Sequence, residues 1–471
     1  MSMEAVDRDP RRGWHAALAV PLAVEVLALV GLAAAGDPTR QPLLTMALLA
    51  VATVCLVAAV RAAARGQSPA AAPLSPRAVL AVAALLRVAL LPLAPTLSTD
   101  VWRYLWDGRV AAHGANPYQL APDDPSLAAM RDELWTRVEH REVPSVYPPL
   151  AMSLFVVPFA LRTGAALLVW KLLVTAADLV ACLVLVRLAA AGGWPAHRVL
   201  WYAAHPLVAL EVAGMGHLEP LGVAASLAVA LLLLRRRPAG AGVAAAAAGL
   251  AKLVPFAALP MWARQARPGS SRALLLPAIG LAALALAPVA FASGGVPAGL
   301  VTYTLRWEYG GPLHEPLWRL LAAAHAPEAV KHGLDLMKEW TGMHALWNHA
   351  YPWAYPQLLS RLALMLAAVG VVARSLTWRD PVRGGAGLFG GLLLCSPTVY
   401  PWYLLWVLPW AALAGRAPWL WAAAAAPLLY VPALFGAPLW PWVHVVLWGP
   451  FVVLWLLEKR SRAVERWPTA R

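Results

Sequence analysis

The chain has 471 residues, of which 61% are hydrophobic and 13% are charged, and its mean hydropathy is +0.63. Soluble globular domains are about half apolar and a quarter charged, so this composition excludes a soluble protein and predicts a membrane protein. The formal net charge of +14 would favour nucleic-acid binding only if the basic residues gathered on one soluble face, which they do not. The three cysteines fall within apolar segments, which excludes a disulfide scaffold.

Apolar segments follow one another along most of the chain. They predict an all-α, polytopic transmembrane protein of about 12–14 segments, folded as a single domain over residues 1–471. The expected segments cover residues 15–35, 42–60, 78–95, 165–186, 199–215, 219–234, 239–263 (a short hairpin), 273–292, 356–373, 384–398, 402–415, 418–435 and 439–457. Several are shorter than the ~20 residues of a perpendicular span, and prolines interrupt many of them, namely Pro206, Pro255, Pro277, Pro409 and Pro427. We therefore expect broken or tilted helices around an internal cavity.

The distribution of Lys and Arg predicts the orientation of these segments. With residue 1 on the cytoplasmic side, 23 of the 38 Lys and Arg residues fall in cytoplasmic connections and 11 fall in outer loops. The positive-inside rule then places both termini in the cytoplasm, with short basic tails at 1–14 and 458–471. The high content of Ala and Arg suggests a GC-rich bacterial genome, and so a multi-pass protein of the bacterial inner membrane.

Two large outer loops, at about 96–162 and 293–355, are the predicted functional regions, because long loops are usually functional. The first begins with the aromatic stretch 97–109 and ends at Tyr147-Pro-Pro149, and its apolar run 150–161 is too short to span, so we expect an interfacial or re-entrant helix there. The second contains the stretch 305–314 and a polar segment with helical character at 327–340.

Asp100 is the leading candidate for a general base. It follows the third segment, where partial desolvation and a cation such as Arg103 can tune its proton affinity. The alternative is a capping role at the next helix, for which Ser98 and Thr99 compete, and the two roles are compatible. Asp107 and Arg109 are expected to form a local structural pair.

Ionisable residues within membrane segments are functional candidates, because an unpaired charge in hydrocarbon is costly. Four of them, His205, Glu211, His217 and Glu219, surround one outer-side turn, and we expect His217 and Glu219 to face the outer cavity. A divalent metal at this turn remains open, although the spacing matches no zinc signature and we expect no cofactor. A buried, hydrogen-bonded polar cluster is the alternative.

Two further buried charges require partners. Lys252 needs an anion, and its candidates are Asp178, Glu211 or the phosphate of a lipid substrate. Asp178 is expected to pair with Lys171 in a structural role. The aromatic corner at 396–403 suits either sugar stacking or the membrane interface.

Several motifs follow a known order along one side of the protein: Asp100, Trp106-Asp-Gly-Arg109, Asn116-Pro-Tyr118, Tyr147-Pro-Pro149, Gly216-His-Leu-Glu219, Lys252, Trp307-Glu308 and the corner 396–403. From about residue 80 to 415 the chain resembles the GT-C glycosyltransferases. More narrowly, it is similar to bacterial mannosyltransferases of the cell envelope that take the sugar from a polyprenyl phosphate.

The resemblance implies an inverting transfer of a hexose, most of all mannose, from a polyprenyl-phosphate-linked donor to a hydroxyl of a glycolipid or glycan on the extracytoplasmic face. Asp100 matches the position of the acid that acts as the general base. The departing phosphate would meet Lys252, with His217 and Arg306 as further candidates. The substrate cavity would include Arg103, Tyr104, Asp107, Arg109, Tyr147, Glu219, Trp307, Glu308, Tyr400, Trp402 and Tyr403.

Two other functions remain open on the sequence alone. A multi-span transporter or lipid flippase would also need broken helices and buried charges, but it would not need two large loops on one side. An enzyme of another class, such as a lipid-phosphate transferase or a glycan ligase, is the second alternative.

Overall fold

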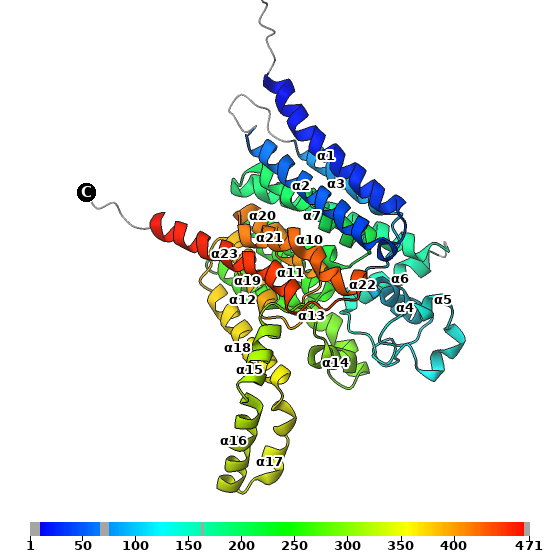
Figure 1. Ribbon diagram of the computed structural model, residues 1–471. Helices are drawn as coiled ribbons and strands as arrows, with labels where there is room; N and C mark the ends of the chain where they lie inside the picture. Colours follow the sequence, from blue (N-terminus) through cyan, green and yellow to red (C-terminus); the bar gives the residue numbers. More distant parts are fainter. Residues whose placement is uncertain (1–9, 66–74, 162–163, 466–471) are drawn as a thin grey trace, which may run out of the picture.

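The computed structural model describes residues 10–65, 75–161 and 164–465 (Figure 1). These ranges are predominantly helical and contain no strand; two isolated bridges join Tyr309 and Gly310 to Thr398. The all-α prediction is therefore confirmed. The predicted tails at 1–14 and 458–471 lie partly outside the described residues.

Helices follow one another along the whole of the described ranges. The first third of the chain forms α1 (Pro10–Ala34), α2 (Pro42–Arg65), α3 (Pro76–Leu90), α4 (Asp100–Ala112), α5 (Glu133–Thr136) and α6 (Pro149–Ala160). The middle forms α7 (Ala166–Gly192), α8 (Leu200–Ala203), α9 (Pro206–Ala209), α10 (Glu219–Leu234), α11 (Pro238–Ala251), α12 (Leu259–Gln265), α13 (Ser271–Ala292) and α14 (Ala298–Arg306). The last part forms α15 (His314–Ala323), α16 (Ala326–Thr341), α17 (His344–Asn348), α18 (Pro356–Ser375), α19 (Pro381–Leu394), α20 (Leu408–Ala414), α21 (Ala417–Ala425), α22 (Val431–Phe435) and α23 (Trp442–Glu465).

Short turns of other helix types connect these elements. They are the 3-10 helices η1 (Pro38–Arg40), η2 (Pro125–Met130), η3 (Ala196–Val199), η5 (Val254–Ala258), η6 (Tyr351–Trp353), η7 (Pro401–Trp406) and η8 (Ala426–Tyr430), and the π-helical turn η4 (Leu210–Gly214). The prolines explain several of them, since Pro206 begins α9, Pro255 lies in η5 and Pro409 lies in the first turn of α20. The predicted interruption at Pro277 is wrong, because α13 continues through this residue.

Seven helical stretches in the described ranges are long and apolar enough to cross a membrane. They are Ala17–Ala34, Pro42–Arg65, Ala166–Gly192, Ser271–Ala292, Pro356–Ser375, Ala417–Phe435 and Trp442–Ser461. Three shorter apolar helices, α6, α10 and α11, accompany them. The chain is therefore a membrane protein, and several of the other predicted segments are short or broken helices that pack within the bundle.

The central helices pack against one another, and the two large loops, at about 96–162 and 293–355, extend from one end of the bundle (Figure 1). Helix α10 packs between α7 and α11, and α11 also packs on α13. Helix α6 packs against α4 and α7, and at 12 residues it is too short to cross a bilayer alone. The predicted helix at 327–340 is confirmed as α16, which extends with α17 away from the bundle in Figure 1.

A buried ion pair joins three of the N-terminal elements. The Arg87 Nε of α3 donates to Asp178 Oδ2 of α7 at 2.9 Å, and the Tyr202 hydroxyl donates to Asp178 Oδ1 at 2.7 Å. Asp178 is therefore structural, but the predicted pairing with Lys171 is wrong. Lys171 instead donates to the carbonyl groups of Leu91 and Leu93, at 2.7 and 2.9 Å.

Replacing Asp178 by Ala should lower the free energy of unfolding by about 3–5 kcal/mol, because it leaves the guanidinium of Arg87 buried without its anion. Thermal unfolding in detergent measures this loss. The double variant Arg87→Met/Asp178→Leu is the control, because it removes both charges, and its melting temperature should lie closer to that of the native protein. A single variant as stable as the native protein would contradict a structural role for the pair.

Candidate functional site

A chamber of about 860 Å³ lies where the two large loops meet the helices. Its walls come from the start of α4, the loop before α6, the turn after α11, helix α14, the corner 396–403 and α22. Its polar and aromatic lining consists mainly of Asp100, Arg103, Tyr104, Glu139, His140, Tyr147, Lys252, Tyr303, Trp307, Tyr309, Tyr400, Trp402, Tyr403 and Tyr430. Residues separated by more than 300 positions in the sequence thus share one cavity.

Helix α4 carries Asp100 to the chamber at its first turn. Thr99 is the N-cap residue, and the Asp100 N–H donates to Ser98 Oγ at 3.3 Å. Asp100 therefore does not cap the helix, and its carboxylate points into the chamber, where a negative charge at a helix N-terminus is favourable. Its Oδ2 atom accepts a hydrogen bond from the Tyr104 hydroxyl at 3.4 Å.

The position of α4 depends on close packing against α6. A Cβ atom at Gly108 would lie 2.0 Å from the Phe155 carbonyl oxygen, so only glycine allows the two helices to approach this closely. The ring of Tyr104 stacks on Phe155 at 4.9 Å and meets the edge of Tyr147 at 5.1 Å. This packing fixes the turn of α4 that carries Asp100.

The surroundings of Asp100 increase its proton affinity. Its side chain is 38% exposed to the chamber and is otherwise enclosed by protein. Burial raises the pKa of Asp100 from 3.8 to about 6, and the nearby negative charge of Glu219 adds to this effect while Lys252 opposes it. A carboxylate with a pKa near the working pH is suited to general-base catalysis.

Lys252 lies directly after the end of α11, in extended backbone, and points into the chamber. Its ammonium forms an ion pair with Glu219 Oε1 and lies 4.1 Å from the centre of the Tyr403 ring. The predicted protein partners, Asp178 and Glu211, are therefore wrong. Glu219 is completely buried, whereas the Lys252 side chain keeps 24% exposure.

His217 lies behind the chamber wall, between two carboxylates. Its ring stacks on Trp402 at 3.8 Å, with Nδ1 3.9 Å from Asp100 Oδ2 and Nε2 3.4 Å from Glu211 Oε2. The expectation that His217 and Glu219 face the cavity differs from the structure, because both are fully buried and neither lines the chamber. The fourth member of the predicted cluster, His205, lies elsewhere and accepts a hydrogen bond from the Leu207 N–H at 3.2 Å.

The corner 396–403 forms an aromatic wall with the second large loop. The rings of Tyr309, Tyr400, Trp402 and His217 stack in succession, at centroid distances of 4.4, 4.5 and 3.8 Å. The backbone between the two segments is joined as well, since the Val399 N–H donates to the Tyr309 carbonyl at 2.6 Å. The corner therefore lies in the wall of the chamber.

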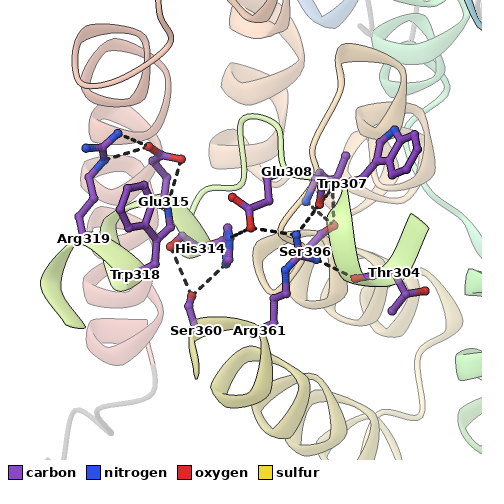
Figure 2. A network of polar contacts seen from close by, with 11 residues as sticks. Thr304, Trp307, Glu308, His314, Glu315, Trp318, Arg319, Ser360, Arg361 and Ser396 are labelled. Carbon is purple, nitrogen blue, oxygen red and sulfur yellow. Dashed lines mark hydrogen bonds and ion pairs between the residues drawn. The ribbon is translucent and has the colours of Figure 1, made fainter. Parts of the chain in front are cut away.

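Glu308 does not line this chamber. Figure 2 shows its carboxylate between His314 and Arg361, with Nε2 of His314 at 3.3 Å and Nη2 of Arg361 at 3.0 Å. The hydrogen bond from His314, together with that from Arg361, holds the pKa of Glu308 below its ordinary value. Arg361 also donates to the Trp307 carbonyl at 2.8 Å, so this network connects the second large loop to α18.

The other predicted cavity residues occupy different surroundings. Arg103 lines the chamber and pairs with Asp107 at 2.8 Å, whereas Arg109 pairs with Asp132 at 2.9 Å, so the predicted pairing of Asp107 with Arg109 is wrong. Asp107 and Arg109 both lie outside the chamber lining. Arg306 is exposed and lines a smaller pocket of about 260 Å³, which shares Trp307 and Tyr400 with the chamber.

The sequence did not predict that Tyr303 and Tyr430 line the chamber, or where Glu211 lies. The Tyr430 hydroxyl donates to both carboxylate oxygens of Glu211, at 2.9 and 2.8 Å. The hydroxyl groups of Tyr303 and Tyr403 are hydrogen-bonded. A single polar side chain in the apolar stretch 426–435 was the available signal for Tyr430.

One comparison with known families decides the classification. The family model described as "Alpha-(1->6)-mannopyranosyltransferase, N-terminal domain" matches residues 13–266, which is more than half of the chain. The chain belongs to this mannosyltransferase family. No curated protein and no solved structure matches it.

The mannosyltransferase is accordingly a glycosyltransferase of the membrane, and the predicted resemblance to GT-C mannosyltransferases is confirmed. The matched region contains Asp100, His217, Glu219 and Lys252. The aromatic wall at Tyr309 and 396–403 lies beyond the match, so the second half of the mannosyltransferase completes a chamber whose charged groups come from the first half. Among the residues that the structure describes, no three His, Cys, Asp or Glu side chains group as metal ligands.

Proposed function

We propose that this mannosyltransferase moves mannose from a polyprenyl-phosphate-linked donor to an acceptor hydroxyl on the extracytoplasmic face, with inversion. The observation that carries the proposal is that Asp100, a carboxylate with raised pKa, and Lys252, a partly exposed ammonium, line one chamber. This pair provides a base for the nucleophile and a cation for the leaving group.

In the proposed reaction, Asp100 takes the proton of the acceptor hydroxyl while the acceptor oxygen attacks the anomeric carbon. The bond between this carbon and the phosphate oxygen breaks, and its electron pair leaves with the phosphate. The Lys252 ammonium meets the developing charge, since it has three donors and the ion pair with Glu219 does not use all of them. Attack opposite to the leaving group converts a β-linked donor into an α-linked product, which agrees with the linkage in the family description.

The charge distribution supports an extracytoplasmic chamber in a bacterial inner membrane. Much of the chamber wall, including Asp100, comes from the two loops that the positive-inside rule assigns to the outer face. A donor with a polyprenyl tail would remain in the bilayer while its sugar phosphate enters the chamber. The acceptor would be a glycolipid or glycan that reaches the chamber from outside, and the aromatic wall would stack against sugar rings.

The donor can be tested with purified protein in proteoliposomes. We expect transfer of radiolabelled mannose from polyprenyl-phosphate mannose to membrane glycolipids or glycans, and no transfer from a nucleotide-linked mannose. The product should carry an α-anomeric proton signal by NMR. Transfer from the nucleotide sugar but not from the lipid donor would contradict the proposal.

The pH dependence of the reaction follows from Asp100. The base acts only when it is deprotonated, so kcat should fall as the pH decreases through about 6. A carboxylate with its ordinary pKa of 3.8 would keep the enzyme active about two pH units lower. Initial rates between pH 4.5 and 8 at saturating donor measure this decrease, which is the acidic limb of the pH profile of kcat. A rate that is constant down to pH 4.5 would contradict the assignment of Asp100 as the base.

A further inference from the structure

Two buried side chains behind Asp100 have no role in the reaction described above. Glu211 lies in the π-helical turn η4 and is fully buried, and Tyr430 lies at the end of η8. With His217 they form a series of neighbouring polar groups. His217 Nδ1 lies 3.9 Å from Asp100 Oδ2, His217 Nε2 lies 3.4 Å from Glu211 Oε2, and the Tyr430 hydroxyl donates a hydrogen bond to Glu211.

We propose that Glu211, held by Tyr430, is a positioning residue that fixes the tautomer and orientation of His217 and thereby directs Asp100 to use Oδ1 as its basic atom. This inference rests on the proposed function, because it concerns residues that lie behind the proposed base.

The protonation of Glu211 follows from its contacts. Within the described ranges it forms no ion pair with Lys or Arg, and its polar contacts are the Tyr430 hydroxyl and the His217 ring. A buried carboxylate without a cation is costly, so the neutral acid is the favoured form. When Tyr430 donates to Oε1, the O–H of Glu211 at Oε2 faces His217 Nε2, 3.4 Å away.

This arrangement selects one tautomer of His217. With the Glu211 O–H directed at Nε2, this nitrogen is a hydrogen-bond acceptor, so the hydrogen of the neutral ring lies on Nδ1, which faces Asp100. Nδ1–H and the Tyr104 hydroxyl both point toward Oδ2, so Oδ1 remains available to an acceptor hydroxyl. The distance of 3.9 Å is longer than a hydrogen bond, and such contacts commonly shorten when substrate binds.

The local backbone supports a fixed His217 ring. The π-helical turn at Leu210–Gly214 is of a type that occurs often at functional sites. Gly216 then adopts a left-handed conformation with φ of 80°, which returns the chain so that the His217 N–H donates to the Glu211 carbonyl at 2.9 Å. Stacking on Trp402 fixes the plane of the ring.

The test compares Glu211→Met with Glu211→Gln, using mannosyl transfer from polyprenyl-phosphate mannose. Methionine fills similar space but donates nothing to Nε2, so kcat should fall about 10- to 100-fold with little change in the donor KM. The acidic limb of kcat should also move upward by about half to one pH unit, because the carboxylate of Asp100 loses a hydrogen bond. Glutamine donates to Nε2 and accepts from Tyr430, so it should restore most of the rate and the native limb.

The other ionisable groups that face Asp100 are unchanged in both variants. They are Tyr104, Glu139, Tyr147, Glu219, Lys252, Tyr303, Tyr400, Tyr403 and Tyr430. A shift of the acidic limb therefore reports on His217. A purely structural role of Glu211 would lower the folded yield of Glu211→Met and leave the limb at its native position.

Three results would overturn the inference: full activity in Glu211→Met, equal losses in both variants, or a native acidic limb in Glu211→Met. If Glu211→Met does not fold, Tyr430→Phe provides the test, because it removes the hydroxyl that holds Glu211. We expect this variant to have a lower kcat and an acidic limb at higher pH. A native kcat and a native limb in Tyr430→Phe would contradict the proposal. Failure of the proposed function is distinguishable, since then the native protein itself transfers no mannose from the lipid donor. If the native protein transfers mannose and the Glu211 and Tyr430 variants behave like it, this inference is overturned while the proposed function stands.

Discussion

Replacing Asp100 by Asn is expected to lower kcat for mannosyl transfer by roughly 10²–10⁴-fold, the usual contribution of a positioned general base. Asparagine has the same shape and keeps an oxygen for Tyr104, but it cannot accept the proton of the acceptor hydroxyl. Binding of the donor should stay close to native, because the substitution preserves the volume of the chamber. Rates under saturating donor, with folded protein quantified by gel filtration, measure the effect.

Glu139→Gln is the matched control for this variant. Glu139 lines the same chamber and its carboxylate is exposed, so its substitution removes one negative charge without removing the proposed base. We expect kcat to stay within about threefold of native, as is usual for an exposed charge. Comparable losses in both variants would indicate a general effect of charge in the chamber, and a fully active Asp100→Asn would exclude Asp100 as the base.

The second large effect concerns Lys252. Lys252→Met should lower kcat by roughly 10²–10³-fold, because it removes the cation that stabilises the departing phosphate. The single variant also leaves Glu219 buried without its partner, which should reduce the free energy of unfolding by about 3–5 kcal/mol. Activity must therefore be expressed per folded molecule.

A double variant separates catalysis from stability at Lys252. Lys252→Met/Glu219→Gln removes both charges, so its thermal stability should recover toward native while its transfer rate stays low. Lys252→Arg keeps a cation in the chamber and should retain more activity than Lys252→Met. If the double variant regains native kcat, Lys252 serves only as the partner of Glu219, and another group meets the phosphate.

Composition and hydropathy predicted the fold class because helical membrane segments are defined by local length and apolarity. The breaks at Pro206, Pro255 and Pro409 were also predictable, since proline cannot continue the hydrogen bonding of a helix interior. Pro277 was not, because whether a helix continues through a proline depends on the packing around it.

The pairing of charges was less accessible from the sequence. Lys252 pairs with Glu219 and Arg87 with Asp178, at sequence separations of 33 and 91 residues. Such pairs depend on how helices are arranged in space, so neither the distant partners proposed for Lys252, Asp178 and Glu211, nor the nearby pairing of Asp107 with Arg109 was correct. Asp107 has a different partner from the one predicted even within its own helix. Arg103 lies one turn before Asp107 and pairs with it directly.

The central claim is that mannosyl transfer from the lipid donor requires Asp100 as the base. A single-turnover experiment tests this claim. Native protein and Asp100→Asn are each loaded in proteoliposomes with radiolabelled polyprenyl-phosphate mannose, then mixed with excess acceptor at pH 7.5. We predict rapid transfer by the native protein, and in the variant a donor that stays bound and uncleaved. Equal rates of transfer by the two proteins, or no transfer by the native protein while a nucleotide-linked mannose is used, would contradict the account.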